Sequence, residues 1–382
     1  MATPTQNRLG FIDNLRWVMI VFVVSMHAAV TYSHMGSWYF MEDPKPDNLG
    51  MRVFFGYYQM GLQAFFMGLL FLIAGYFVPE AYDRKGWGRF LRDRFIRLGI
   101  PSLLYMLVVH PVTVFWLLRD YYKITASFPT AYIAYLRRFQ FVGSSGPMWF
   151  TVALFGFCLV YSLMRKGKSG APPSTSDAPL PSQGQVIILI LVMGLCTFLV
   201  RIVQPMGTSI LNMQLCFFSQ YVLLFAVGIV ARRRNWLLRL PYDFGMRWFR
   251  LALIGGSLIW MTAILTIVAT HTEQHISGGF SWQSGVVCFW ESFFCLGVCL
   301  GLIVFFREKL SRQGRFARWM ADNSFAVYLF HTPVLIAVTL VMHGFTAPKP
   351  VKFLVATVLA TVATYMASCF VFRRIPLLNR VL

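Results

Sequence analysis

Residues 11–33 read FIDNLRWVMIVFVVSMHAAVTYS, an apolar run with the length of a membrane-spanning helix. A bilayer core of about 30 Å is crossed by roughly 20 helical residues. The run nevertheless contains Arg16 and His27, and such side chains are costly in hydrocarbon, so they usually face a bundle interior, a cavity or a partner. The stretch therefore predicts a membrane helix and also indicates a functional site.

Similar apolar runs recur along the 382 residues of the chain, of which 57% are hydrophobic and only 13% are charged. This composition is typical of a polytopic membrane protein. We predict an all-α integral membrane protein forming one domain over residues 1–382, because no hydrophilic block is long enough for a separate soluble domain. A β-barrel would show short alternating segments instead. The ten predicted spans are residues 11–33, 53–78, 98–119, 147–164, 185–204, 211–231, 251–270, 284–306, 322–343 and 350–372.

The net charge of +20 could indicate nucleic-acid binding, but the distribution of the basic residues favours a membrane explanation. Most lysines and arginines fall on one side of the ten predicted spans, and the positive-inside rule makes that side, with both termini, cytoplasmic. We therefore predict the lipid bilayer as a partner and no nucleic acid. Residues 165–185, RKGKSGAPPSTSDAPLPSQGQ, are predicted to be a flexible cytoplasmic linker because this composition cannot pack a core.

Polar residues follow one face of the first predicted span. Arg16 and His27 are eleven residues apart, which is three helical turns plus roughly 20°, so they share a face and lie about 16 Å apart along the axis. Asp13 and His34 extend this track towards the two ends. A neutral imidazole inside the membrane can take a proton at physiological pH. The alternative is that Arg16 reaches lipid headgroups and His27 bonds a neighbouring helix.

Two arginines stand at the entrance to the third predicted span, in the sequence RDRFIRLGIP. Arg94 and Arg97 are three residues apart, and arginine forks bind phosphate oxygens well. This pair predicts a phosphate site at the cytoplasmic surface. Basic residues here also satisfy the positive-inside rule and bind anionic lipids, so that interpretation stays open.

Two further ionisable residues lie within predicted spans. Glu291 indicates either a relay or substrate site or a structural ion pair with Arg201 or another buried donor. His331 precedes Pro333, and it either lines the same cavity or stabilises the proline kink. The seven cysteines form no CxxC pair, so we assign no metal site and interpret them as small buried hydrophobic residues.

Together these features resemble the membrane-bound acyltransferase type 3 family, most closely its glucans biosynthesis protein C branch. In the first span, Arg16 and His27 match the family's motif of a basic residue, ten residues and a histidine. One departure falls in the stretch of the second span, where the family usually has Ser-Gly-Phe or Ser-Gly-Tyr and this chain has Ala74-Gly75-Tyr76. The resemblance covers residues 8–382 apart from the linker. Its other motifs are QAFFMGLLFLIAGYF, the pair Arg94 and Arg97, GPMWFTVALF with Trp149, NSFAVYLFHTPVL with Tyr328 and His331, and the tail RRIPLLNRVL.

The resemblance implies transfer of an acyl group from cytoplasmic acyl-coenzyme A to a hydroxyl of an extracytoplasmic glycan. For the glucan branch the donor would be succinyl-coenzyme A, the acceptor a periplasmic glucan and the location the bacterial inner membrane. Acyl-coenzyme A would be a co-substrate, with no permanently bound cofactor. His27 would act as general base or form a transient acyl-histidine, Arg16 would guide the thioester arm, and Arg94 with Arg97 would hold the coenzyme phosphates. The remaining candidates for a cavity or relay are Asp13, His34, Trp149, Glu291, Tyr328 and His331.

The main alternative is a proton-coupled transporter that uses His27, Glu291 and His331 as a relay, because buried titratable groups are common in transporters. The chain shows neither an internal repeat nor paired spans interrupted by glycine or proline, which disfavours this reading. A non-catalytic membrane scaffold is a third possibility, and it gives no reason for the polar track along the first span.

Overall fold

The computed structural model describes residues 9–42, 48–167 and 178–374, and these ranges are almost entirely helical. They contain no β-strand beyond an isolated bridge between Ile210 and Met213, so the all-α prediction is confirmed. The α-helices are α1 (Gly10–Ser33), α2 (Leu49–Arg94), α3 (Ile100–Leu104), α4 (His110–Leu117), α5 (Phe128–Arg137), α6 (Trp149–Arg165), α7 (Gln183–Val203), α8 (Phe218–Arg233), α9 (Trp236–Arg239), α10 (Tyr242–Arg250), α11 (Gly256–Ala269), α12 (Trp282–Lys309), α13 (Arg315–Val341) and α14 (Lys349–Phe370).

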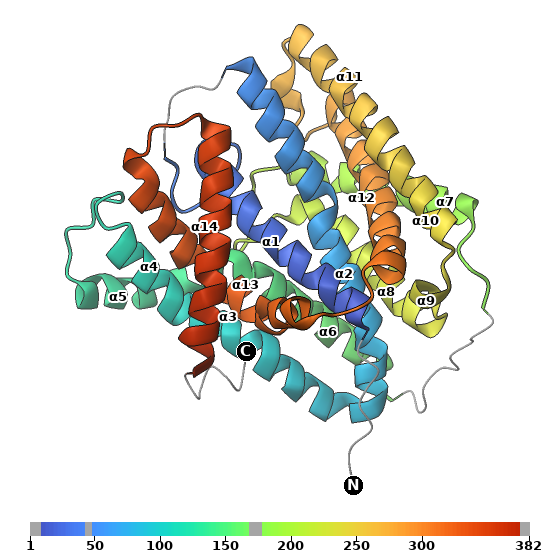
Figure 1. Cartoon of the computed structure of the whole chain (residues 1–382), viewed down its shortest axis with the longest axis horizontal. Helices are drawn as coiled ribbons and strands as arrows, with labels where there is room; N and C mark the ends of the chain where they lie inside the picture. The colour runs from blue at the N-terminus through green and yellow to red at the C-terminus, as the bar shows by residue number, and fades with distance from the viewer. Residues whose placement is uncertain (1–8, 43–47, 168–177, 375–382) are drawn as a thin grey trace.

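Nine helical stretches of the described residues are long and apolar enough to cross a membrane. One of them, Leu49–Leu117, has 69 residues, far more than the roughly 20 that one crossing needs. Within it Gly86 has φ 70° and ψ 173°, which is not helical, and the chain turns at the lower end of α2 and runs back towards α3 (Figure 1). This stretch therefore contains two of the ten predicted spans. The side of the membrane on which the termini lie stays a prediction.

The helix that contains the second predicted span continues beyond the predicted end of that span. Beyond residue 78, α2 continues to the non-helical Gly86 and, after that kink, to Arg94. Ion pairs hold this extension against the end of α8, because Glu80 contacts Arg232 at 2.5 Å and Asp83 contacts Arg233 at 2.5 Å. These charges thus stabilise a contact between α2 and α8.

The predicted linker at residues 165–185 is described only at its ends, and residues 168–177 lie outside the described residues. On its C-terminal side α7 already begins at Gln183, capped by Ser182. The indole of Trp236 donates a hydrogen bond of 3.0 Å to the Pro179 carbonyl. This side of the segment is therefore attached to α9.

The helix that carries the polar track lies inside the bundle. Helix α1 packs against α2, α12, α13 and α14, and Figure 1 shows it in the middle of the fold. By contrast α7, α11 and α14 leave large aliphatic side chains uncovered, as at Ile188, Leu258 and Leu354, which is the expected character of lipid-facing helices. Helix α1 is consequently surrounded by other helices over most of its length, whereas Arg16 near its start is exposed.

Helices α2 and α8 cross in direct backbone contact. A Cβ atom at Gly75 would overlap the carbonyl oxygen of Phe225, and one at Gly228 would overlap that of Leu72. Small residues allow this approach, which is a common way to join membrane helices. Ala74, adjacent to Gly75, instead lines a cavity between the helices.

Candidate functional site

A cavity of about 820 Å³ opens at the end of the bundle where α1 begins. Its walls come from α1, α2, the π-helical turn that follows α2, α6 and α13. The structure thus places segments from both ends of the sequence around one space. The deeper lining is mainly apolar, with Ile20, Leu70, Ile73, Phe77, Phe150 and Leu154 among its residues.

Three arginines that the sequence singles out share this cavity. Arg16, Arg94 and Arg97 all line it, although Arg16 is 78 positions or more before the other two in the chain. Neither Arg94 nor Arg97 forms an ion pair with a described residue, and the Arg94 guanidinium lies over the Phe90 ring at 5.1 Å. Two more cations, Arg84 and Lys85, line the same space.

The acidic residues of the cavity have basic partners. Asp93 forms an ion pair with Lys85, and Asp13 lies 3.8 Å from Arg16 on the adjacent turn of α1. Glu80 is bound to Arg232 of α8, as described above. The acids therefore neutralise neighbouring cations, and Arg94 and Arg97 can offer donors to an anionic ligand.

Tyr328 of α13 stands at the inner end of the cavity. Its hydroxyl donates a hydrogen bond to the carbonyl of Pro147, which ties α13 to the start of α6. The ring centroid of Tyr328 lies 6.2 Å from that of His331 and 6.3 Å from that of Phe150. Tyr328 thus lines the cavity and also adjoins the histidine one turn further along α13.

His331 meets His27 beyond this tyrosine. Their nitrogens, Nε2 of His331 and Nδ1 of His27, lie 2.9 Å apart, and the two rings are nearly parallel with centroids 5.1 Å apart. His331 is completely buried, whereas His27 is partly accessible. The sequence predicts His27 as the catalytic residue and His331 as a possible cavity or relay residue, and the structure brings them into direct contact across 304 residues.

Trp38 completes the histidine cluster, and the sequence reasoning missed it. Its indole stacks on the face of the His27 ring, with centroids 3.8 Å apart and planes at 13°, whereas His331 contacts the ring edge. Trp38 lies in the irregular segment after α1, where no helical periodicity relates it to His27. The only signal was the aromatic character of the sequence SWYF next to His34.

His34 and Trp149 occupy other positions. His34 ends α1 in a left-handed conformation with φ 58°, and its Nε2 is buried without a hydrogen-bond partner among the described residues. Trp149 does not line the cavity but stacks on Tyr221 of α8 at 5.6 Å. Its neighbour Phe150 lines the cavity instead.

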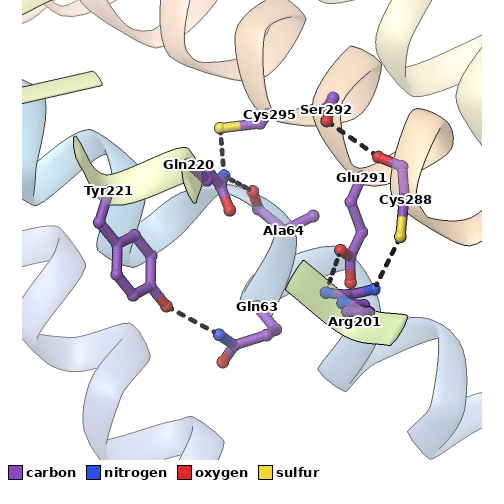
Figure 2. A network of polar contacts seen from close by, with 9 residues as sticks. All are labelled: Gln63, Ala64, Arg201, Gln220, Tyr221, Cys288, Glu291, Ser292 and Cys295. Atoms are coloured by element: carbon purple, nitrogen blue, oxygen red, sulfur yellow. Dashed lines mark hydrogen bonds and ion pairs between the residues drawn. The ribbon is translucent and has the colours of Figure 1, made fainter. Parts of the chain in front are cut away.

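Glu291 forms a buried ion pair with Arg201, which is one of the two alternatives left open by the sequence. The Nη2 and Oε2 atoms are 2.5 Å apart. Figure 2 shows the pair beside Cys288, whose sulfur lies 3.7 Å from Nη1 of Arg201. No described contact joins Glu291 to His27 or His331, so the three groups of the alternative relay do not form a connected chain.

Comparison with known proteins identifies the class of enzyme to which the chain belongs. Residues 9–373 match the family model described as an acyltransferase domain. The chain belongs to this acyltransferase family. The match includes the cavity and the histidine cluster, and the protein is therefore a multi-pass membrane acyltransferase. No curated protein and no solved structure matches the chain.

Proposed function

We propose that this acyltransferase takes an acyl group from cytoplasmic acyl-coenzyme A and transfers it to a hydroxyl on an extracytoplasmic acceptor, with His27 as general base. The observation that carries the proposal is the shared cavity of Arg16, Arg94 and Arg97, whose inner wall, Tyr328, adjoins the histidine cluster. A cationic entrance and an apolar interior suit a ligand with phosphates at one end and an uncharged arm at the other.

Acyl-coenzyme A has this chemical form. Arg94 and Arg97 would bind its phosphates, because guanidinium groups make strong, often bidentate hydrogen bonds to phosphate oxygens. Arg16 would lie beside the arm that carries the thioester, which would extend along the apolar lining of the cavity. The thioester would pass the Tyr328 side chain on its way to His27, since that ring lines the cavity and adjoins His331.

Every atom and proton of the transfer is accounted for when His27 acts as the base. His27 takes the proton of the acceptor hydroxyl while the hydroxyl oxygen bonds to the carbonyl carbon of the thioester. The carbon–sulfur bond then breaks, and the leaving thiolate takes the proton from His27. The products are an ester and free coenzyme A, and His27 returns to its neutral state. In the variant with an acyl-histidine, the imidazole itself attacks first.

The resemblance to the glucan branch supplies the specific substrates of the proposal. Succinyl-coenzyme A would be the donor and a periplasmic glucan the acceptor, in the inner membrane of a bacterium. The predicted topology supports this arrangement, because it places the end of α1 that carries Arg16 in the cytoplasm and His27 roughly three turns deeper. Transfer would add negative charge to a neutral glycan.

A transfer assay in liposomes tests the proposal. The purified protein is supplied with labelled succinyl-, acetyl- or longer acyl-coenzyme A and a glucan acceptor, and label in the glycan is measured. We expect His27→Gln to lose transfer by about 10²- to 10⁴-fold, the usual contribution of a general base. His275→Gln, at an exposed residue of the loop after α11, is the matched control.

Two results would count against the proposal. One is transfer by His27→Gln at the rate of the unchanged protein, and the other is no transfer from any donor by the unchanged protein. Movement of a solute across the liposome membrane without consumption of thioester would instead indicate a transporter.

A further inference from the structure

Two hydrogen bonds in series connect His27 to the backbone of α13. Nδ1 of His27 lies 2.9 Å from Nε2 of His331, and Nδ1 of His331 lies 2.8 Å from the carbonyl oxygen of Tyr328. The series therefore runs from a partly accessible imidazole, through a completely buried one, to a main-chain acceptor.

The last bond determines the direction of the whole series. A carbonyl oxygen can only accept, so Nδ1 of His331 carries a proton. In a neutral His331 the other nitrogen, Nε2, then has a lone pair and accepts from Nδ1–H of His27. A neutral His27 with a proton on Nδ1 has its lone pair on Nε2. One backbone carbonyl thus sets the tautomer of both rings.

We infer that His331 is a positioning residue that holds His27 in its Nδ1–H tautomer, so that Nε2 of His27 is the atom that removes the proton from the acceptor hydroxyl. The inference rests on the proposed function and adds the reactive atom and the residue that prepares it. In a serine hydrolase a carboxylate does this work through the distal nitrogen of the base, and here a neutral imidazole bound to a carbonyl does it.

The replacement of a carboxylate by an imidazole changes where the positive charge is stabilised. When His27 takes a proton, the carbonyl of Tyr328 cannot take one in turn, so the charge stays on the two imidazoles. The indole of Trp38 lies 3.8 Å from the His27 ring with nearly parallel planes, which places its π face against the developing cation. Trp38 and His331 thus support His27 in two ways, one through the ring face and one through the ring nitrogen.

Nitrogen NMR on the full-length protein in lipid bilayers tests the tautomer directly. The seven histidines are labelled with ¹⁵N, and the signals of His27 are assigned by their loss in His27→Gln. We expect a protonated Nδ1 and a bare Nε2 in His27 of the unchanged protein. This spectrum needs no substrate, so it is independent of the transfer assay.

Two substitutions at His331 test its role in catalysis. The side-chain oxygen of glutamine in His331→Gln can accept from Nδ1–H of His27, whereas leucine in His331→Leu cannot. We expect His331→Leu to lower kcat by about 10²-fold with little change in KM for the donor, because the wrong tautomer removes the base but not the donor site. We expect His331→Gln to keep the tautomer and most of the rate.

Several outcomes would overturn the inference. A proton on Nε2 of His27 in the unchanged protein would do so whether or not the leucine variant folds. Equal loss of rate in the glutamine and leucine variants, or full rate in both, would also contradict it. A protein that shows the expected tautomer but transfers no acyl group would disprove the proposed function while supporting the tautomer assignment.

Discussion

The guanidinium of Arg201 and the carboxylate of Glu291 form an ion pair inside the helix bundle, and both side chains are buried. The pair joins α7 to α12 across 90 residues of sequence. Neighbouring side chains extend it, since the Arg201 guanidinium lies 5.0 Å from the Phe217 ring centre and beside Cys288 (Figure 2). Within the described residues this is a structural link between helices, distinct from the histidine cluster.

Breaking this ion pair on one side is expected to destabilise the protein. In Glu291→Gln the charge of Arg201 stays buried without its partner, a loss of about 3–5 kcal/mol for a buried pair. The double variant Arg201→Met with Glu291→Leu removes both charges and should be more stable than either single change. Thermal unfolding in detergent measures both effects. Equal stability of Glu291→Gln and the unchanged protein would show that the pair does not support the fold.

The contact between α2 and α8 predicts a strict need for glycine. In Gly228→Ala the added methyl overlaps the backbone of α2, so the helices must separate, at a cost of about 1–3 kcal/mol. Gly156→Ala in α6 is the control, because a Cβ there meets nothing within 4 Å. The folded fraction after extraction and its melting temperature are the measurements. Similar losses in both variants would argue against the close crossing.

Arg94 and Arg97 are predicted to contribute to donor binding rather than to the chemical step. Each change to glutamine removes a charged hydrogen bond, so KM for acyl-coenzyme A should rise about 10-fold per residue while kcat changes less. The unchanged protein should also bind the donor more weakly at high salt. Arg89→Gln is the control, because Arg89 is an exposed residue of the same helix that does not line the cavity. Equal KM values for Arg94→Gln and Arg89→Gln would contradict the phosphate assignment.

The stacking of Trp38 on His27 predicts an effect on the rate of the chemical step. Trp38→Leu removes the π face that stabilises the protonated imidazole, worth about 0.5–2 kcal/mol, so kcat should fall by about 2- to 30-fold. Trp38→Phe retains a smaller aromatic face and should lie between leucine and the unchanged protein. Single-turnover transfer assays separate this step from donor binding. An unchanged kcat in Trp38→Leu would remove Trp38 from the mechanism.

Helix positions could be predicted from the sequence because they depend mainly on local transfer free energies. The predicted span at residues 185–204 closely matches α7 at Gln183–Val203. The predicted span at residues 284–306 lies within α12. Beyond the predicted end of the second span at residue 78, α2 continues, and an ion pair between Glu80 and Arg232 holds this continuation against α8. Hydropathy contains no information about such distant charge partners.

The sequence by itself determined which residues of α1 share a face, because helical geometry relates Arg16 to His27 without any other element. Only the tertiary structure decided that Arg16 lines a cavity with Arg94 and Arg97, and that Tyr328 of this cavity adjoins His331. Contacts across 304 residues, such as that between His27 and His331, depend on how helices pack. A single sequence gives the composition and periodicity of each helix, whereas the partner of each side chain follows from the packing of the whole bundle.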